Sequence, residues 1–249
     1  GYDYGTYAIG GSADKIFTVS NSGGVSATSV TGSGLSAPFS FKGGTFPGTG
    51  GNCGSSISSG ASCTVVVTYA PTATGTTVQS VQIGYNDGLS AQSENRAVQG
   101  TAVTPALLTI SDGPTFDYGT LIATASADHT FTVSNSGGFG ASFMAGSGLA
   151  APFSFKGGSF PGTGGTCGAS LPAASNCTIV VTYAPTVAGS FNDVIDISYV
   201  NGASSQTASR ALQGLAVSPA NLSINSGPTY NYGTLPTNNS ATHTFTVTN

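Results

Sequence analysis

Four cysteines are the residues of this chain with the clearest chemistry, and they form two pairs of equal spacing. Cys53 and Cys63 bracket a loop rich in serine and glycine. Cys167 and Cys177 repeat the arrangement 114 residues further along the chain. A zinc site would need two more ligands for each pair, and no histidine lies between the cysteines of either pair. The spacing therefore predicts a disulfide within each pair, and disulfides indicate an oxidising compartment.

The two histidines are weak candidates for catalysis. His129 and His243 occupy equivalent positions, and Lys15 stands at the same position earlier in the chain. A serine nucleophile needs an imidazole base beside it, and a catalytic histidine replaced by lysine would leave one copy inactive. We therefore interpret these residues as exposed positions on strands, and we predict that the chain is not an enzyme.

The glycine-rich stretches 43–54 and 157–168 are the next candidates for a binding site. They lack the GK[ST] ending and the following helix of a phosphate-binding loop, so we predict no nucleotide or other cofactor. They are expected to be long hairpin loops in which glycine supplies positive φ. Phe46 and Phe160 would lie at the tips, where exposed rings make each loop a candidate contact with a neighbouring chain.

Charged residues are scarce, with 5 Lys and Arg, 9 Asp and Glu, and a net charge of −4. Nucleic-acid binding needs clustered Lys and Arg, so this composition predicts no nucleic-acid partner. Asp112 and Asp117 bring too few oxygens together for calcium, and we predict no metal. No run of about 20 apolar residues occurs, so the sequence predicts no membrane span and no signal peptide within this stretch.

The arginines are expected at the surface. Arg96 and Arg210 recur at equivalent positions of the last strand of each repeat. We expect them to form exposed ion pairs with Asp14 and Asp128, and such pairs contribute less than about 1 kcal/mol.

Similarity at the 114-residue offset extends along the whole chain. Residues 1–103 and 115–217 are identical at more than half of their positions, with no gap. We predict an immunoglobulin-like repeat in 1–103 that lacks its first strand, a second repeat in 104–217, and the opening strands of a third in 218–249. Because nothing before Gly1 matches the segment 105–114, we expect the chain to be a window of a longer array.

Each repeat has the pattern of seven or eight short strands. Thr64–Tyr69 is a β-branched and aromatic run, and His129–Asn135 alternates polar with apolar residues. Gly, Pro and Asn turns separate such runs, and no helical periodicity occurs. The sequence therefore predicts an all-β fold of tandem immunoglobulin-like antiparallel β-sandwiches.

The junctions between repeats are short. Val103 and Pro105 mark the first junction, and Val217 and Pro219 mark the second. Each proline fixes its own φ and restricts the residue before it, so the connector is expected to be extended and semi-rigid. We therefore expect the array to form a semi-rigid rod.

An ordered series of motifs runs through each repeat. Tyr-Gly-Thr opens it, FTVSNSGG and APFSFKGG follow, and the cysteine pair leads into VVTYAPT before a closing Gln-Gly. This series resembles the bacterial choice-of-anchor D repeat, of the Hydin-type, major-sperm-protein-like group of immunoglobulin-like domains. The resemblance implies tandem β-sandwiches in secreted or surface-attached bacterial proteins and no catalytic residues. The cysteine pairs and the low charge agree with that extracellular setting.

The function that we expect is structural: a repeat segment of a filament or adhesin stalk on the bacterial surface. Its partners would be neighbouring repeats or other copies of the chain. The strand Pro219–Ile224 could complete the first domain of another copy by strand addition, although a truncated array explains the same facts. The alternative is a carbohydrate- or surface-binding module with Tyr and Phe in its loops, although such platforms favour Trp and the chain has none.

Overall fold

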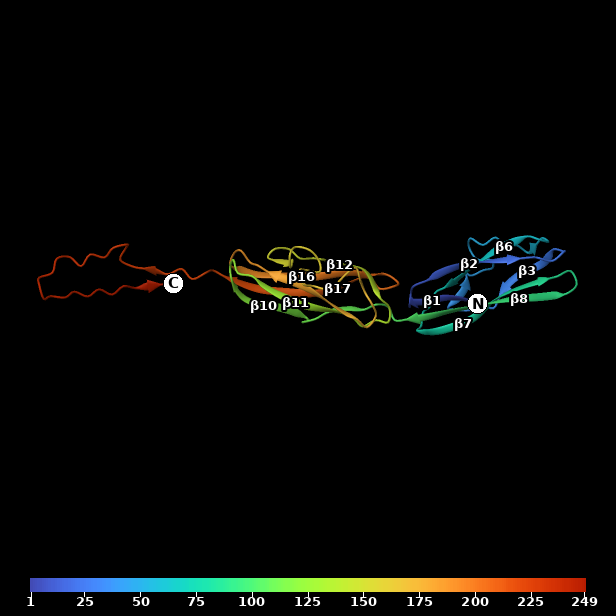
Figure 1. Ribbon diagram of the computed structural model, residues 1–249, viewed down its shortest axis with the longest axis horizontal. Coiled ribbons are helices and arrows are strands. Elements are labelled where there is room, and N and C mark those ends of the chain that lie inside the picture. The colour runs from blue at the N-terminus through green and yellow to red at the C-terminus, as the bar shows by residue number, and fades with distance from the viewer.

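The chain forms two β-sandwiches and an open pair of strands, as described by a computed structural model of residues 1–249 (Figure 1). All of its regular elements are strands, and it has no helix that is long and apolar enough to cross a membrane. The strands of the first sandwich are β1 (Tyr2–Ala8), β2 (Ala13–Ser20), β3 (Ala27–Ser33), β4 (Phe39–Phe41), β5 (Ser56–Ile57), β6 (Ser62–Tyr69), β7 (Gly75–Asn86) and β8 (Ala91–Val103).

Two sheets make up the first sandwich. One has the strand order β1-β8-β7-β3-β5, and the other has the order β2-β6-β4. Side chains alternate between the faces of a strand, so the β-branched run of β6 sends Val65, Val67 and Tyr69 into the core, where all three are buried. The strand β2 lies at the edge of its sheet.

The second sandwich repeats this arrangement with one strand more. Its strands are β9 (Leu108–Ile110), β10 (Thr115–Ile122), β11 (Ala127–Asn135), β12 (Ala141–Ser147), β13 (Phe153–Phe155), β14 (Ser170–Leu171), β15 (Asn176–Tyr183), β16 (Gly189–Val200) and β17 (Ser205–Val217). The sheets have the orders β10-β17-β16-β12-β14 and β13-β15-β11-β9. β9 pairs with β11 and adds buried residues of its own, so the buried core has 20 residues here and 14 in the first sandwich.

The prediction of an all-β fold built from tandem sandwiches is confirmed, with one correction to the antiparallel pairing. β1 pairs with β8 in parallel, and β10 pairs with β17 in the same way. A whole domain of chain separates the two partners, so no hairpin turn forces them to be antiparallel. A shift of register after Asp3 interrupts the first of these ladders, where Gly5 takes a positive φ and donates its N–H to the Asp3 carboxylate.

The rest of the chain forms only one short ladder. β18 (Ser223–Ile224) pairs with β19 (Val247–Thr248). The register matches that of β9 on β11, since Ile224 faces Val247 as Ile110 faces Val133. All residues of both strands are exposed, so this pair has no second sheet over it.

Candidate functional site

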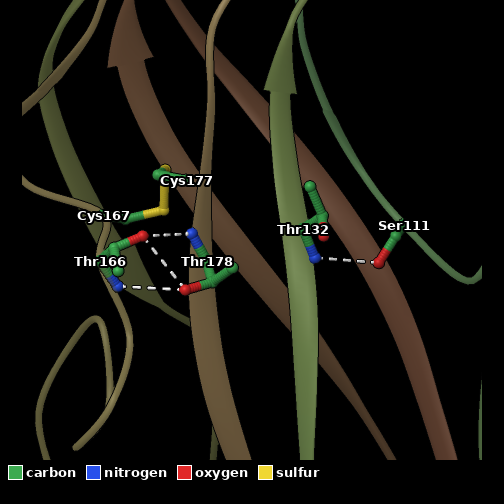
Figure 2. The surroundings of a disulfide bond; sticks show 6 residues. All are labelled: Ser111, Thr132, Thr166, Cys167, Cys177 and Thr178. Carbon is green, nitrogen blue, oxygen red and sulfur yellow. Dashed lines mark hydrogen bonds between the residues drawn. A yellow bond between two sulfur atoms is a disulfide. The ribbon is translucent and has the colours of Figure 1, made fainter.

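The two predicted disulfides are present, and each ties a loop to the first residues of a strand. Cys53 bonds to Cys63 near the start of β6, and Cys167 bonds to Cys177 near the start of β15. Beside the second disulfide, Thr166 and Thr178 are joined by hydrogen bonds (Figure 2). The N–H of each residue donates to the hydroxyl of the other, and the two hydroxyls are also hydrogen-bonded. All four cysteines are buried and none is free, so the sulfur atoms support structure rather than offering a reactive thiol.

The glycine-rich loops do not present their phenylalanines to solvent, which corrects the prediction of exposed tips. Phe46 is half-buried and meets the ring of Phe41 edge-on, with 5.5 Å between the centroids. Phe160 meets Phe155 in the same way at 5.6 Å. Both rings pack against the core because a glycine on the facing strand, such as Gly146, leaves room for them.

The surface ion pairs also differ from the prediction. Asp14 pairs with Lys42 at 2.7 Å, and Asp128 pairs with Lys156 at 2.7 Å, in place of the expected arginines. Hydrogen bonds from these lysines, and then from the threonines Thr68 and Thr182, hold the pKa values of both carboxyls below their usual range. Arginine is instead used inside the second sandwich, where Arg210 donates to the carbonyl of Ile110.

The histidines are partly covered rather than fully exposed. His129 stacks on Phe116 with the ring centroids 3.8 Å apart, and its Nε2 lies 3.1 Å from the carboxylate of Asp112. Ser111 donates its hydroxyl to the same carboxylate, at 2.7 Å. The bond from Ser111, followed by that from His129, lowers the pKa of Asp112.

This group of serine, aspartate and histidine lacks the geometry of a nucleophilic triad. A triad needs the serine hydroxyl to donate to the imidazole, whereas Ser111 donates to the carboxylate. At the equivalent position of the third repeat, His243 stacks on Tyr230, and in the first repeat the ammonium of Lys15 lies over Tyr2. In all three repeats the side chain at this position lies over an aromatic ring, and this shared contact indicates a packing role.

The remaining carboxylates are dispersed. No three of the His, Cys, Asp and Glu side chains gather in a way that could hold a metal ion. Asp117 accepts hydrogen bonds from Gln213 and from the N–H of Gly119, and these bonds lower its pKa. Asp112 and Asp117 do not converge on a common site, since their carboxylates have different hydrogen-bond partners.

The first junction holds the two sandwiches in contact. β8 ends at Val103, and the connector to β9 is fixed at both ends by hydrogen bonds from the second sandwich. Gly138 donates its N–H to the hydroxyl of Thr104 at 2.8 Å, and the N–H of Ala106, next to Pro105, donates to the carbonyl of Asn201 at 3.0 Å. Figure 1 shows the sandwiches end to end.

A small contact surface lies beside this connector. Ala8, at the end of β1, is fully buried, whereas Ile122, at the equivalent end of β10, is 53% exposed. The difference arises because the loop between β16 and β17 covers Ala8: a Cβ atom added to Gly202 would lie 2.7 Å from the Cβ of Ala8. At the second junction, Val217 and Pro219 are exposed.

No protein-family model matches the chain, and no curated protein matches it. Among solved structures, similarity is found to the VesB protease of Vibrio cholerae, with 13% identity, a TM-score of 0.36, and coverage of 45% of this chain and 32% of the protease. The human CEP192 PapD-like domain 7 matches with 16% identity and a TM-score of 0.35 over 45% of this chain and 87% of its own. Protocadherin gamma B7 cadherin domains 1–4 match with 7% identity and a TM-score of 0.40, over 89% of this chain and 51% of the protocadherin chain. At this level of similarity none of the three bears on function.

Proposed function

We propose that this chain is a repeat segment of a non-enzymatic structural protein outside the bacterial cell, in a filament or an adhesin stalk. The observation that carries the proposal is the first junction, where two disulfide-bonded sandwiches join through a hydrogen-bonded connector and a covered Ala8. Such a unit extends the molecule along its axis and bears load, and its side chains do not assemble a reactive group.

Two further observations support the extracellular setting. The disulfides are consistent with an oxidising compartment. The motifs that resemble the choice-of-anchor D repeat point in the same direction. The alternative of a sugar-binding platform has less support, because Phe46 and Phe160 are turned towards the core.

Negative-stain electron microscopy of the native material tests this proposal. We expect rods or long fibres whose axial repeat matches one or two sandwiches. Shearing the cell surface should release the same particles, and reductant should make them less resistant to proteolysis. Globular particles with freely varying angles between sandwiches would contradict the proposal.

A further inference from the structure

The loop between β16 and β17 carries the one Asn-Gly pair of the chain, Asn201-Gly202. An asparagine followed by glycine loses its side-chain amide readily, because no Cβ atom hinders the glycine nitrogen as it attacks the carboxamide. Both residues are half-buried, so water reaches them. The pair also belongs to the first junction, since the carbonyl of Asn201 accepts the N–H of Ala106 at 3.0 Å.

The turn folds the carboxamide of Asn201 over the peptide bond that follows it. Its Oδ1 accepts the N–H groups of Ala203 and Ser204, both at 2.9 Å. A side chain that bonds to the backbone two and three residues ahead must bend back over that stretch of chain. The N–H of Gly202 donates to no group of the chain, so its nitrogen is free to react. The carboxamide carbon and the nitrogen that can attack it are therefore held near each other.

The two N–H donors also favour negative charge on the side-chain oxygen. In the equivalent turn of the first sandwich, Oδ1 of Asp87 accepts the N–H groups of Ser90 and Leu89, each at 2.8 Å, and these bonds lower the pKa of Asp87. The glycines that follow Asp87 and Asn201 have φ of +96° and +97°, so the two turns share one conformation. Attack on Cγ of Asn201 develops negative charge on its Oδ1, and donors placed in this way stabilise such an oxyanion.

We propose that Asn201-Gly202 is a self-modification site whose only co-reactant is water. The nitrogen of Gly202 gives its proton to water and bonds to Cγ of Asn201, and the bond from Cγ to the amide nitrogen breaks. The amide nitrogen takes a proton back from water and leaves as ammonia, so that a succinimide ring remains. Water then opens the ring at either carbonyl, which gives aspartate or isoaspartate with one added negative charge.

The isoaspartate product does not fit the junction. Its backbone runs through Cγ and is one methylene longer, and the carbonyl that received the N–H of Ala106 becomes a free carboxylate. Gly202 has no room for the longer chain, because an added Cβ atom would lie 2.7 Å from the Cβ of Ala8 and 2.5 Å from the ring of Phe139. We therefore expect the loop to move away from Ala8 and the junction to loosen.

The aspartate product, in contrast, keeps the turn. Asp87 already stands at this position in the first sandwich and accepts the same pair of N–H groups. Its own N–H donates to the carbonyl of Ser90 at 3.1 Å, as the N–H of Asn201 donates to that of Ser204 at 3.0 Å. The variant Asn201→Asp is therefore a control that carries the new charge without the longer backbone.

This inference goes beyond the proposed function by giving the junction a limited lifetime. The sandwiches are held in line while the amide is intact, and they are released as isoaspartate accumulates with age. The chemistry at Asn201 does not depend on what the rod does. Only its effect on stiffness rests on the proposed function.

Ageing the folded 249-residue chain in buffer at neutral and mildly alkaline pH tests the chemistry. We expect Asn201 to lose its amide before the other asparagines, and to lose it faster at higher pH, because the nitrogen attacks only after losing its proton. Peptide mapping by mass spectrometry locates the change, and an isoaspartyl methyltransferase detects isoaspartate. Asn201→Ser, whose hydroxyl can form the same kind of turn, should accumulate no isoaspartate in this loop. If Asn201 keeps its amide under conditions in which a peptide of residues 198–205 loses it, the site is overturned.

Small-angle X-ray scattering tests the effect on the junction. We expect the isoaspartate fraction to shift to a shorter maximum dimension than the fresh chain, and we expect Asn201→Asp to match the fresh chain. Unchanged scattering of the isoaspartate fraction overturns the release of Ala8, and equal shortening in Asn201→Asp overturns the role of the longer backbone. Straight rods of the fresh chain in electron micrographs would leave the proposed structural function intact in each case.

Discussion

Two tyrosine rings at the centre of the sandwiches depend on the absence of a side chain opposite them. Tyr69 and Tyr183 are fully buried, and burial raises the pKa of both phenols. A Cβ atom added to Gly214 on β17 would lie 2.7 Å from the ring of Tyr183. The glycine is therefore needed for close packing and not for its backbone conformation.

We expect Gly214→Ala to destabilise the second sandwich by about 1–3 kcal/mol, because an added methyl group overpacks a close-packed core. The midpoint of urea unfolding measures the effect. Gly168→Ala is the matched control, since a Cβ atom there meets nothing within 4 Å. Equal midpoints for the two variants would contradict this account of the core.

The acid dependence of stability should come in part from the lysine–aspartate pairs. The hydrogen bond from Lys156, followed by that from Thr182, lowers the pKa of Asp128 in the folded chain. An ordinary Asp in the unfolded chain titrates near about 3.9. The contribution to stability is therefore fully present above that pH and is lost as the pH falls through the lower pKa of the folded state.

We expect Asp128→Asn to reduce the loss of stability between neutral and acid pH, with a small effect because both groups are largely exposed. Urea midpoints measured across that pH range check the slope. Asp193→Asn, on β16 and outside both lysine–aspartate pairs, serves as the control carboxylate. A variant that keeps the full acid dependence of the parent would show that the pair is not its source.

At the scale of elements, β9 completes one sheet of the second sandwich by pairing with β11. Leu108→Ala should destabilise the second sandwich by about 2–5 kcal/mol, because the change removes buried apolar groups and leaves a cavity. Leu107→Ala is the matched control one residue away, on the exposed face of the same chain segment. Hydrogen exchange of the β11 amides should increase in the first variant only.

The strands and the disulfides could be predicted because their signals are local. The β-branched run of β6, the alternation in β11 and the equal cysteine spacing each lie within a short stretch of sequence. The position of Phe46 could not be predicted, because the space for its ring is left by Gly32 on β3, across the sandwich. The lysine partner of Asp14 likewise depends on which side chains the folded sheet brings together.

At the scale of the whole molecule, the stiffness of the first junction is the property on which the proposed function depends. The connector alone fixes only a few backbone angles, and the contact of Ala8 with the loop at Gly202 adds a second point of attachment. Two separate attachments oppose bending in a way that a single connector does not. The alignment of the two sandwiches should therefore depend on residue 8 having a small side chain.

We expect Ala8→Asp to open this contact and to broaden the distribution of angles between the sandwiches, because the carboxylate would seek water. Small-angle X-ray scattering should give a shorter maximum dimension and a wider distribution of distances. Ile122→Asp is the matched control, since the same change falls on the exposed end of β10. If scattering and end-to-end distances are the same for both variants, the connector alone holds the sandwiches in line. Unequal flexibility would instead assign the stiffness of the rod to a contact the size of one alanine methyl group.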